Sequence, residues 1–261
     1  YGVDGVFSFF QNLNINTFLA RTHTPELRGD DRSYRAQLEY NADRYGLVME
    51  DLLVGRNFNP ETGYVRRKDI RRNMAEFRFS PRPASSSVVR KYEFAAGVDR
   101  YSRASDGSLE TQVVEATYGI EFESSDRLDL SLTDNIEALT EPFEVFNGVE
   151  VPLGRYRFQN LNASYNLGTQ HKVSGSVSYE YGGFFGGTKH TVGFSRGRTE
   201  PIANLFIEPG VSINWVDVPQ GRFIAKVLNS RAIYTLTPRT VVGALVQYVP
   251  EDHALSGNAR F

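Results

Sequence analysis

The sequence has 261 residues, of which 40% are hydrophobic, and it contains 18 Phe, 14 Tyr and no Cys. A formal net charge of −2 argues against a nucleic-acid-binding protein, because phosphate binding normally requires a basic domain, and the lack of Cys excludes thiolate metal sites, Cys nucleophiles and disulfides. No apolar stretch approaches the roughly 20 residues of a transmembrane helix, which excludes a helical membrane protein.

The hydrophobic pattern has a period of two along most of the chain, beginning with YGVDGVFSFF at residues 1–10. Residues 34–41, 114–123 and 172–181 alternate apolar and polar side chains, which is typical of strands with one face of each kind. No window of comparable length predicts an amphipathic helix, so we expect an all-β fold. The predicted strands cover residues 3–10, 13–22, 32–40, 45–55, 66–80, 88–102, 109–123, 127–137, 155–166, 172–181, 188–195, 204–215, 222–235, 239–248 and 254–261.

The links between these strands alternate in length. Short links, such as 124–126, alternate with extended ones, such as 23–31, 56–65 and 138–154, although 196–203 is long for its class. The pattern predicts a meander with tight turns at one end and long loops at the other. Within 155–166 the apolar phase shifts between Phe158 and Leu161, which predicts a β-bulge.

This layout is typical of a bacterial transmembrane β-barrel, with short periplasmic turns and long extracellular loops. Many predicted strands reach the roughly 9–11 residues that a tilted bilayer crossing needs, and the polar face suits a water-filled lumen. Aromatic residues near strand ends, such as Phe77 and Phe79, match the girdles of such a barrel, although ordinary strand propensity also explains them. We expect an antiparallel, up-and-down transmembrane β-barrel in the outer membrane of a Gram-negative bacterium. A soluble β-rich binding domain is an alternative.

Three stretches, residues 54–72, 141–158 and 175–192, carry a family resemblance. They resemble the C-terminal, barrel-like domain of unassigned function in a family of large Gram-negative envelope proteins, whose N-terminal module is similar to family 9 carbohydrate-binding modules. The most specific match is the NPETGYVRRKD segment at 59–69. The resemblance covers the later half or so of that domain, and therefore implies a partial copy.

The strand count and the first residues lead to the same expectation. Residues 1–10 lack the charged region and cleavage site of a signal peptide, which is typical of a chain entered within a strand. Single-chain bacterial barrels usually have an even number of strands. The predicted ranges above number fifteen, within an expected total of about 14–16 strands. We therefore expect residues 1–261 to form one β-barrel domain fragment that does not close alone.

No residues form a recognisable catalytic or metal constellation. The four His lack metal-ligand spacing, and no G-x-S-x-G elbow occurs, so we expect no catalytic residues, metal or cofactor and lean against an enzyme. An envelope hydrolase with catalytic groups partly outside the chain remains an alternative. The GGFFGG segment at 182–187 predicts a flexible hairpin tip that displays two aromatic rings to a sugar or a lipid.

A run of five cations precedes one predicted strand. Continuing the strand alternation backward places Arg66, Lys68 and Arg72 in the lumen and Arg67 and Arg71 outside. Outward Arg costs about 2–4 kcal/mol at the bilayer midplane, so the run should lie at the extracellular rim. Arg67 and Arg71 would then be interfacial anchors against anionic headgroups or lipopolysaccharide phosphates. The inward three either line a positive mouth that favours anionic solutes or pair with neighbouring carboxylates.

Together these patterns predict an outer-membrane β-barrel protein of the cell envelope, acting in transport as a channel or in surface binding. A link to carbohydrate is implied only by the family resemblance. The expected partners are outer-membrane lipid, lipopolysaccharide and an anionic or carbohydrate solute, without nucleic acid.

Overall fold

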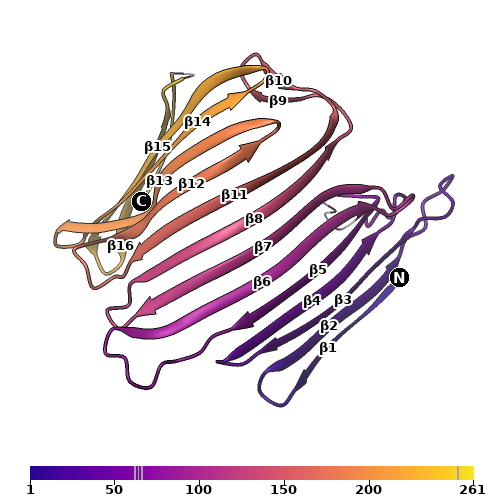
Figure 1. The fold of residues 1–261 in the computed structure, drawn as a ribbon, viewed down its shortest axis with the longest axis horizontal. Coiled ribbons are helices and arrows are strands. Elements are labelled where there is room, and N and C mark those ends of the chain that lie inside the picture. Colours follow the sequence, from indigo (N-terminus) through magenta and orange to yellow (C-terminus); the bar gives the residue numbers. More distant parts are fainter. Residues whose placement is uncertain (62, 64, 66, 252) are drawn as a thin grey trace.

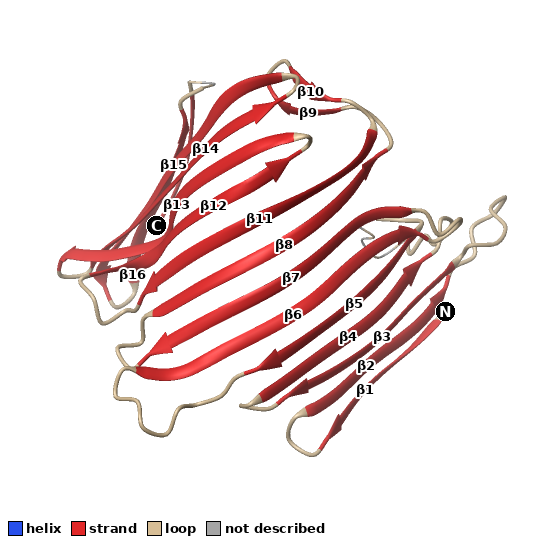
Figure 2. Cartoon of the chain, viewed as in Figure 1, coloured by secondary structure: helices blue, strands red, loops and turns tan. Residues whose placement is uncertain are grey.

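The computed structural model describes residues 1–61, 63, 65, 67–251 and 253–261, and these fold into strands without any helix (Figures 1 and 2). Within this part of the chain no helix is long and apolar enough to cross a membrane. The strands are β1 (Gly2–Phe9), β2 (Leu13–Arg21), β3 (Arg32–Asn41), β4 (Tyr45–Val54), β5 (Ile70–Phe79), β6 (Val89–Arg103), β7 (Leu109–Phe122), β8 (Arg127–Leu139), β9 (Phe143–Phe146), β10 (Val149–Val151), β11 (Gly154–Leu167), β12 (Val173–Phe184), β13 (Gly187–Ile202), β14 (Leu205–Val218), β15 (Gly221–Thr237), β16 (Thr240–Val249) and β17 (Ala254–Arg260).

The described residues form one antiparallel sheet of 15 strands, in which each strand pairs with the next along the chain. The order is interrupted only between β8 and β11, where β9 and β10 form a separate two-stranded sheet. The predicted all-β, up-and-down meander is therefore confirmed. We call the end with links 10–12, 42–44 and 123–126 the turn end, although it also carries the longer link 80–88.

The opposite end of the sheet, which we call the loop end, carries links 22–31, 55–69 and 140–153. Two predictions about links were wrong. The region 138–154 is not only a loop, because it contains the β9–β10 hairpin with Gly148 at φ 75° in its turn. The region 196–203 belongs mostly to β13, which continues to Ile202 by means of register shifts after Phe194.

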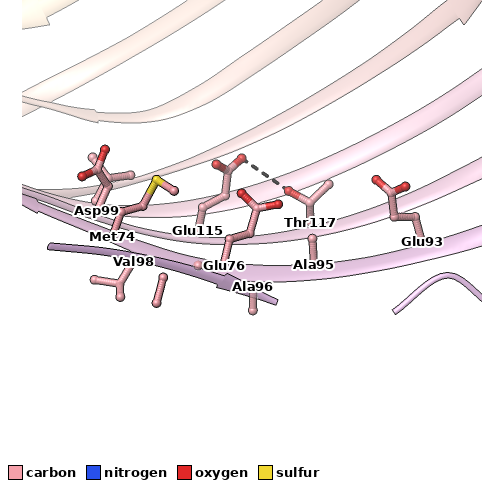
Figure 3. A pocket seen from close by; sticks show the side chains of 12 residues that line it. Met74, Glu76, Glu93, Ala95, Ala96, Val98, Asp99, Glu115 and Thr117 are labelled. Carbon is pink, nitrogen blue, oxygen red and sulfur yellow. Dashed lines mark hydrogen bonds between the residues drawn. The ribbon is translucent and has the colours of Figure 1, made fainter. Parts of the chain in front are cut away.

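Strand alternation gives the sheet one apolar and one polar face. Cross-strand partners such as Leu132 and Leu161 share the apolar face, whereas their neighbours Ser131 and Asn162 share the polar face. The apolar face carries large exposed side chains on many strands, including Met49, Phe77, Val114, Leu132, Leu161, Val177, Trp215, Leu228 and Val246. Figure 3 shows the two faces directly, because Glu115 and Glu76 project to one side of the sheet and Val98 and Ala96 to the other.

Within the part of the chain that the structure describes, no second layer covers the apolar face of the sheet. Among the described residues, the buried hydrophobic side chains are Val54, Phe58, Ile70, Ile136, Val151, Phe185, Val216 and Val218. Val54, Phe58 and Ile70 form one small cluster at the loop end. A sheet of this size therefore lacks the continuous core that stabilises a soluble domain.

The strands are staggered, so that rows of paired residues run obliquely to the ends of the sheet. The row that begins at Tyr45, the first residue of β4, reaches Lys226 close to the loop end of β15. Closing a sheet into a barrel requires tilted strands and such a stagger. The intermediate partners are Phe79, Phe94, Tyr118, Leu130, Ala163, Tyr179, Val192 and Ile213.

The curved sheet is not closed (Figure 1). Within the described residues, β1 and β17 are its two edges and do not pair with each other. Their outer backbone groups thus lack strand partners in this sheet.

The predicted bulge within 155–166 was also wrong. The pairing of β11 with β8 is continuous from Gly154 to Asn166, and Phe158 simply lies on the polar face. The apparent phase shift arose because a ring on that face packs against other rings at the loop end, including Phe185 at 5.6 Å between centroids.

Candidate functional site

The polar face carries a chain of ion pairs across β3 to β6. The Glu50 carboxylate, whose side chain is only 3% exposed, accepts hydrogen bonds from Arg35 and, at 2.9 Å, from Arg72. Arg72 also donates to Asp99 at 2.7 Å, and its guanidinium lies 5.4 Å from the centre of the Tyr101 ring. Two carboxylates thus offset the charge of Arg72. Of the two alternatives given for the inward cations, Arg72 therefore follows the one in which the cation pairs with neighbouring carboxylates.

A second network lies on the polar face of β6 to β8. Arg127 donates to Glu93 at 2.8 Å and to Asp129 at 2.7 Å, and Lys91 approaches both Glu93 and Glu121. Each of these side chains is partly shielded by its neighbours, so their mutual attraction is stronger than that of fully solvated ions. In both networks on the polar face, most cationic side chains are therefore paired with carboxylates.

A hollow between these networks is acidic (Figure 3). It is lined in part by Met74, Glu76, Asp99 and Glu115. Glu115 accepts a hydrogen bond from the Thr117 hydroxyl, and Glu76 has no hydrogen-bonding or ionic partner among the described side chains. This half of the polar face therefore carries negative charge that the ion pairs do not fully compensate.

The β9–β10 hairpin packs on the polar face at the loop end. The Phe146 ring of β9 stacks on Phe223 of β15 with centroids 4.4 Å apart and planes inclined by 3°. Phe143 packs against Phe185, and Val151 is fully buried. Because β12, β13 and β14 lie between β11 and β15, the hairpin reaches across three strands on the polar face.

This packing corrects the prediction for GGFFGG. Phe185 is only 5% exposed, so it is not displayed on a flexible tip. A Cβ on Gly182 would lie 2.2 Å from the Gln159 carbonyl oxygen, and one on Gly187 would lie 1.9 Å from that of Asp217. These glycines permit close backbone approach rather than flexibility.

Of the described cations predicted to lie at the rim, only Arg71 and Arg72 belong to a strand, because β5 begins at Ile70. Arg71 lies on the apolar face at the loop end of β5 and pairs with Asp51 at 3.0 Å. Asp69 has φ 57°, and β5 begins at Ile70, so the alternation does not continue backward through the run. Arg66 lies outside the described residues.

The two other cations of that run lie beside loop-end groups. Arg67 pairs with Glu110 and lies 5.7 Å from the centre of the Tyr101 ring, which is on the polar face. Lys68 approaches the Asn59 side chain at 3.5 Å. No strand includes Arg67, so strand phase does not place it outward, and its role as an interfacial anchor stays a prediction.

Aromatic rings form a band on the apolar face at the turn end. Tyr45 stacks on Phe79 at 5.4 Å, and Phe94 contacts Phe79 at 6.3 Å and Tyr118 at 5.2 Å. The Arg44 guanidinium lies 5.5 Å from the centre of the Phe79 ring. The pairing register explains the band, because these rings are direct cross-strand partners.

The described residues contain no group of three or more His, Cys, Asp or Glu side chains arranged to hold a metal ion. No family model, no curated protein and no solved structure matches the chain.

Proposed function

We propose that this chain forms most of the wall of a β-barrel in the outer membrane of a Gram-negative bacterium, and that its polar face lines a passage for polar solutes. The observation that carries this proposal is the inverted burial: the uncovered face is apolar, and the two ion-pair networks of β3 to β8 lie on the other face, whereas the pair Arg71–Asp51 on the apolar face lies at the loop end. Hydrocarbon is the environment in which an uncovered apolar sheet face is stable.

The apolar face of a soluble sheet is stable only when a second layer covers it. Burying apolar surface stabilises a fold by roughly 25 cal/mol per Å², and a soluble sheet gains this by packing a second layer on its apolar face. Here Leu132 and Leu161 are 52% and 53% exposed in the middle of the sheet. Lipid chains would cover them in the proposed barrel.

The stagger and the aromatic band support the same function. A row of partners that climbs from the turn end of β4 to the loop end of β15 is what tilted barrel strands require. Rings at the turn end occupy the level of an interfacial girdle, with Arg44 beside them. In the closed barrel, the edges β1 and β17 are paired, either with each other or with further strands.

The loop end then faces the cell exterior. Arg71, on the apolar face, lies at the level of lipid headgroups, where a cation costs about 0–1 kcal/mol rather than the midplane value. Arg67 lies at the same end, beside the polar face. In this proposal Arg71 is the cation next to the phosphates of lipopolysaccharide, where it keeps its partner Asp51, and Arg67 keeps its partner Glu110.

Two neighbouring substitutions on β12 test the membrane assignment. Val177 lies on the apolar face and is 49% exposed, whereas Ser178 lies on the polar face. We expect Val177→Arg to destabilise the chain folded in phosphatidylcholine vesicles by about 2–4 kcal/mol if Val177 lies near the midplane, and Ser178→Arg to change its stability by about 0.5 kcal/mol or less. Folding is followed by far-ultraviolet circular dichroism and protection from protease.

The opposite outcome is equally clear. A chain that folds in buffer without detergent or vesicles, with both Arg variants equally tolerated, is a soluble β-rich domain.

A further inference from the structure

A hollow on the polar face lies beside the β9–β10 hairpin at the loop end. Strands β8, β11, β12 and β13 all contribute to its lining. It differs from the acidic hollow of β5 to β7, because its walls combine phenylalanine rings with side-chain amides. Such mixed lining, apolar with a few convergent polar groups, is typical of sites for small molecules.

The apolar wall consists of three rings. Phe184 meets Phe185 edge-on with centroids 4.8 Å apart, and Phe158 lies 5.6 Å from Phe185. Phe185 is buried, whereas Phe158 and Phe184 remain partly exposed to the hollow. The Lys189 ammonium lies 5.3 Å from the centre of the Phe184 ring and so sits at the edge of this wall.

The polar wall has unused hydrogen-bonding capacity. The Asn160 Nδ2 donates to Glu180 at 3.2 Å, but the buried Asn160 Oδ1 has no partner. Among the described residues, the Asn162 amide also has no hydrogen-bond partner. Asn162 is thus the side-chain amide of this wall whose donor and acceptor are both open to a ligand.

The charges of the hollow do not favour an anion. The cation Lys189 is already paired with Glu180 at 2.7 Å, and Glu137 adds a carboxylate. The open group is therefore the Asn162 amide, which both donates and accepts hydrogen bonds. Neighbouring hydroxyls of a sugar offer the complementary donors and acceptors, while the apolar C–H face of a pyranose ring fits against an aromatic side chain.

We propose that this hollow is a binding site for a carbohydrate ring. The inference rests on the proposed function, for which it names the class of solute. Phe158 and Phe184 supply the apolar contact, and the Asn162 amide hydrogen-bonds the ring hydroxyls. The hairpin keeps Phe185, and through it the other two rings, in position by the contact of Phe143 with Phe185 at 6.3 Å.

Isothermal titration calorimetry of the detergent-folded chain tests the site with maltohexaose as the probe and a polyethylene glycol of similar length as the reference. We expect saturable binding of maltohexaose and none of polyethylene glycol. Asn162→Ala and Phe184→Ala should each weaken binding about tenfold, because each removes one principal contact. Asn258→Ala is the matched control, since Asn258 is an exposed amide on the polar face of β17 and should leave binding unchanged.

Circular dichroism and heat stability of each variant establish that it is folded, and Phe184→Tyr keeps the ring in case Phe184→Ala does not fold. Absence of maltohexaose binding to the folded wild-type chain overturns the proposal, as does equal binding by the Asn162→Ala and Asn258→Ala variants. Either result can occur while the chain still inserts into vesicles, so failure of the sugar site is distinct from failure of the membrane function.

Discussion

His171 Nε2 lies 2.9 Å from Asp126 Oδ1, so a ring in the β11–β12 turn contacts a carboxylate in the β7–β8 turn. The same carboxylate accepts hydrogen bonds from the Gly168 backbone N–H at 2.8 Å and from Gln170 Nε2 at 3.0 Å. Asp126 is 6% exposed. It therefore joins two neighbouring turns at the turn end of the sheet.

This arrangement predicts a dependence of stability on pH. The Gly168 N–H, followed by His171, holds the pKa of Asp126 well below its usual range. The stabilisation is present above the unfolded-state pKa of about 4 and is lost as pH falls through the lower folded-state value. We expect urea unfolding in detergent micelles to show wild type more stable than Asp126→Asn at neutral pH, with the gap narrowing below about pH 4. A gap that is independent of pH would contradict this role.

Two adjacent arginines on β5 should differ in their contribution to stability. Arg72 is 26% exposed and bridges Glu50 and Asp99, whereas Arg71 is 48% exposed and pairs with Asp51 alone. We expect Arg72→Met to lower the free energy of unfolding by about 1–3 kcal/mol, because it leaves the buried Glu50 with fewer donors. Arg71→Met should cost about 0–1 kcal/mol.

A double variant separates the contribution of the Arg72–Glu50 ion pair to stability from that of the packing of the Arg72 side chain. Arg72→Met combined with Glu50→Gln should recover part of the loss, because it removes the buried charge that Arg72 compensated. Equal effects of Arg71→Met and Arg72→Met in urea unfolding would show that the polar-face network is as weak as a surface pair.

The long strands could be predicted from sequence because one period runs through each of them. In 114–123 every second residue is apolar, and the structure places these residues on one exposed face of β7. The predicted strands therefore coincide with the fifteen strands of the described sheet to within a few residues at most ends, apart from the start of β5 and the end of β13.

The candidate site was less accessible from sequence, because it depends on contacts between distant residues. The Asn147-Gly148 dipeptide between short alternating segments was a usable signal for the β9–β10 hairpin. Nothing local indicates that Phe146 stacks on Phe223. Likewise, Phe158 broke the apolar phase and indicated a bulge, since the aromatic cluster on the polar face could not be foreseen from β11 alone.

The docked hairpin should be released by removing one ring of its stack. Glu144 and Glu150 are exposed residues of the hairpin and are cleavage sites for a glutamate-specific protease. Phe146→Ala removes a stacked pair worth about 0.5–1.5 kcal/mol beyond its buried area, so we expect cleavage there to accelerate several-fold. Mass spectrometry of the fragments locates the cut.

The control for this experiment is Phe94→Ala, which removes a ring from the apolar face far from the hairpin. It should leave cleavage at the hairpin unchanged. Equally slow cleavage of Phe146→Ala and wild type would mean that the hairpin is held by other contacts, such as Val149 against Gly221.

Two glycines on the polar face should respond differently to a methyl group. A Cβ on Gly182 would lie 2.2 Å from the Gln159 carbonyl oxygen and 2.6 Å from Asn160 Cα, which are backbone atoms that cannot rotate away. At Gly243 the nearest atom is the Ala232 carbonyl oxygen at 3.9 Å. We expect Gly182→Ala to lower the free energy of unfolding by about 1–3 kcal/mol through overpacking, and Gly243→Ala to be neutral or slightly stabilising. Because β11 and β12 also frame the proposed sugar site, Gly182→Ala should weaken maltohexaose binding as well, whereas a stable variant with unchanged affinity would refute the close approach of these strands.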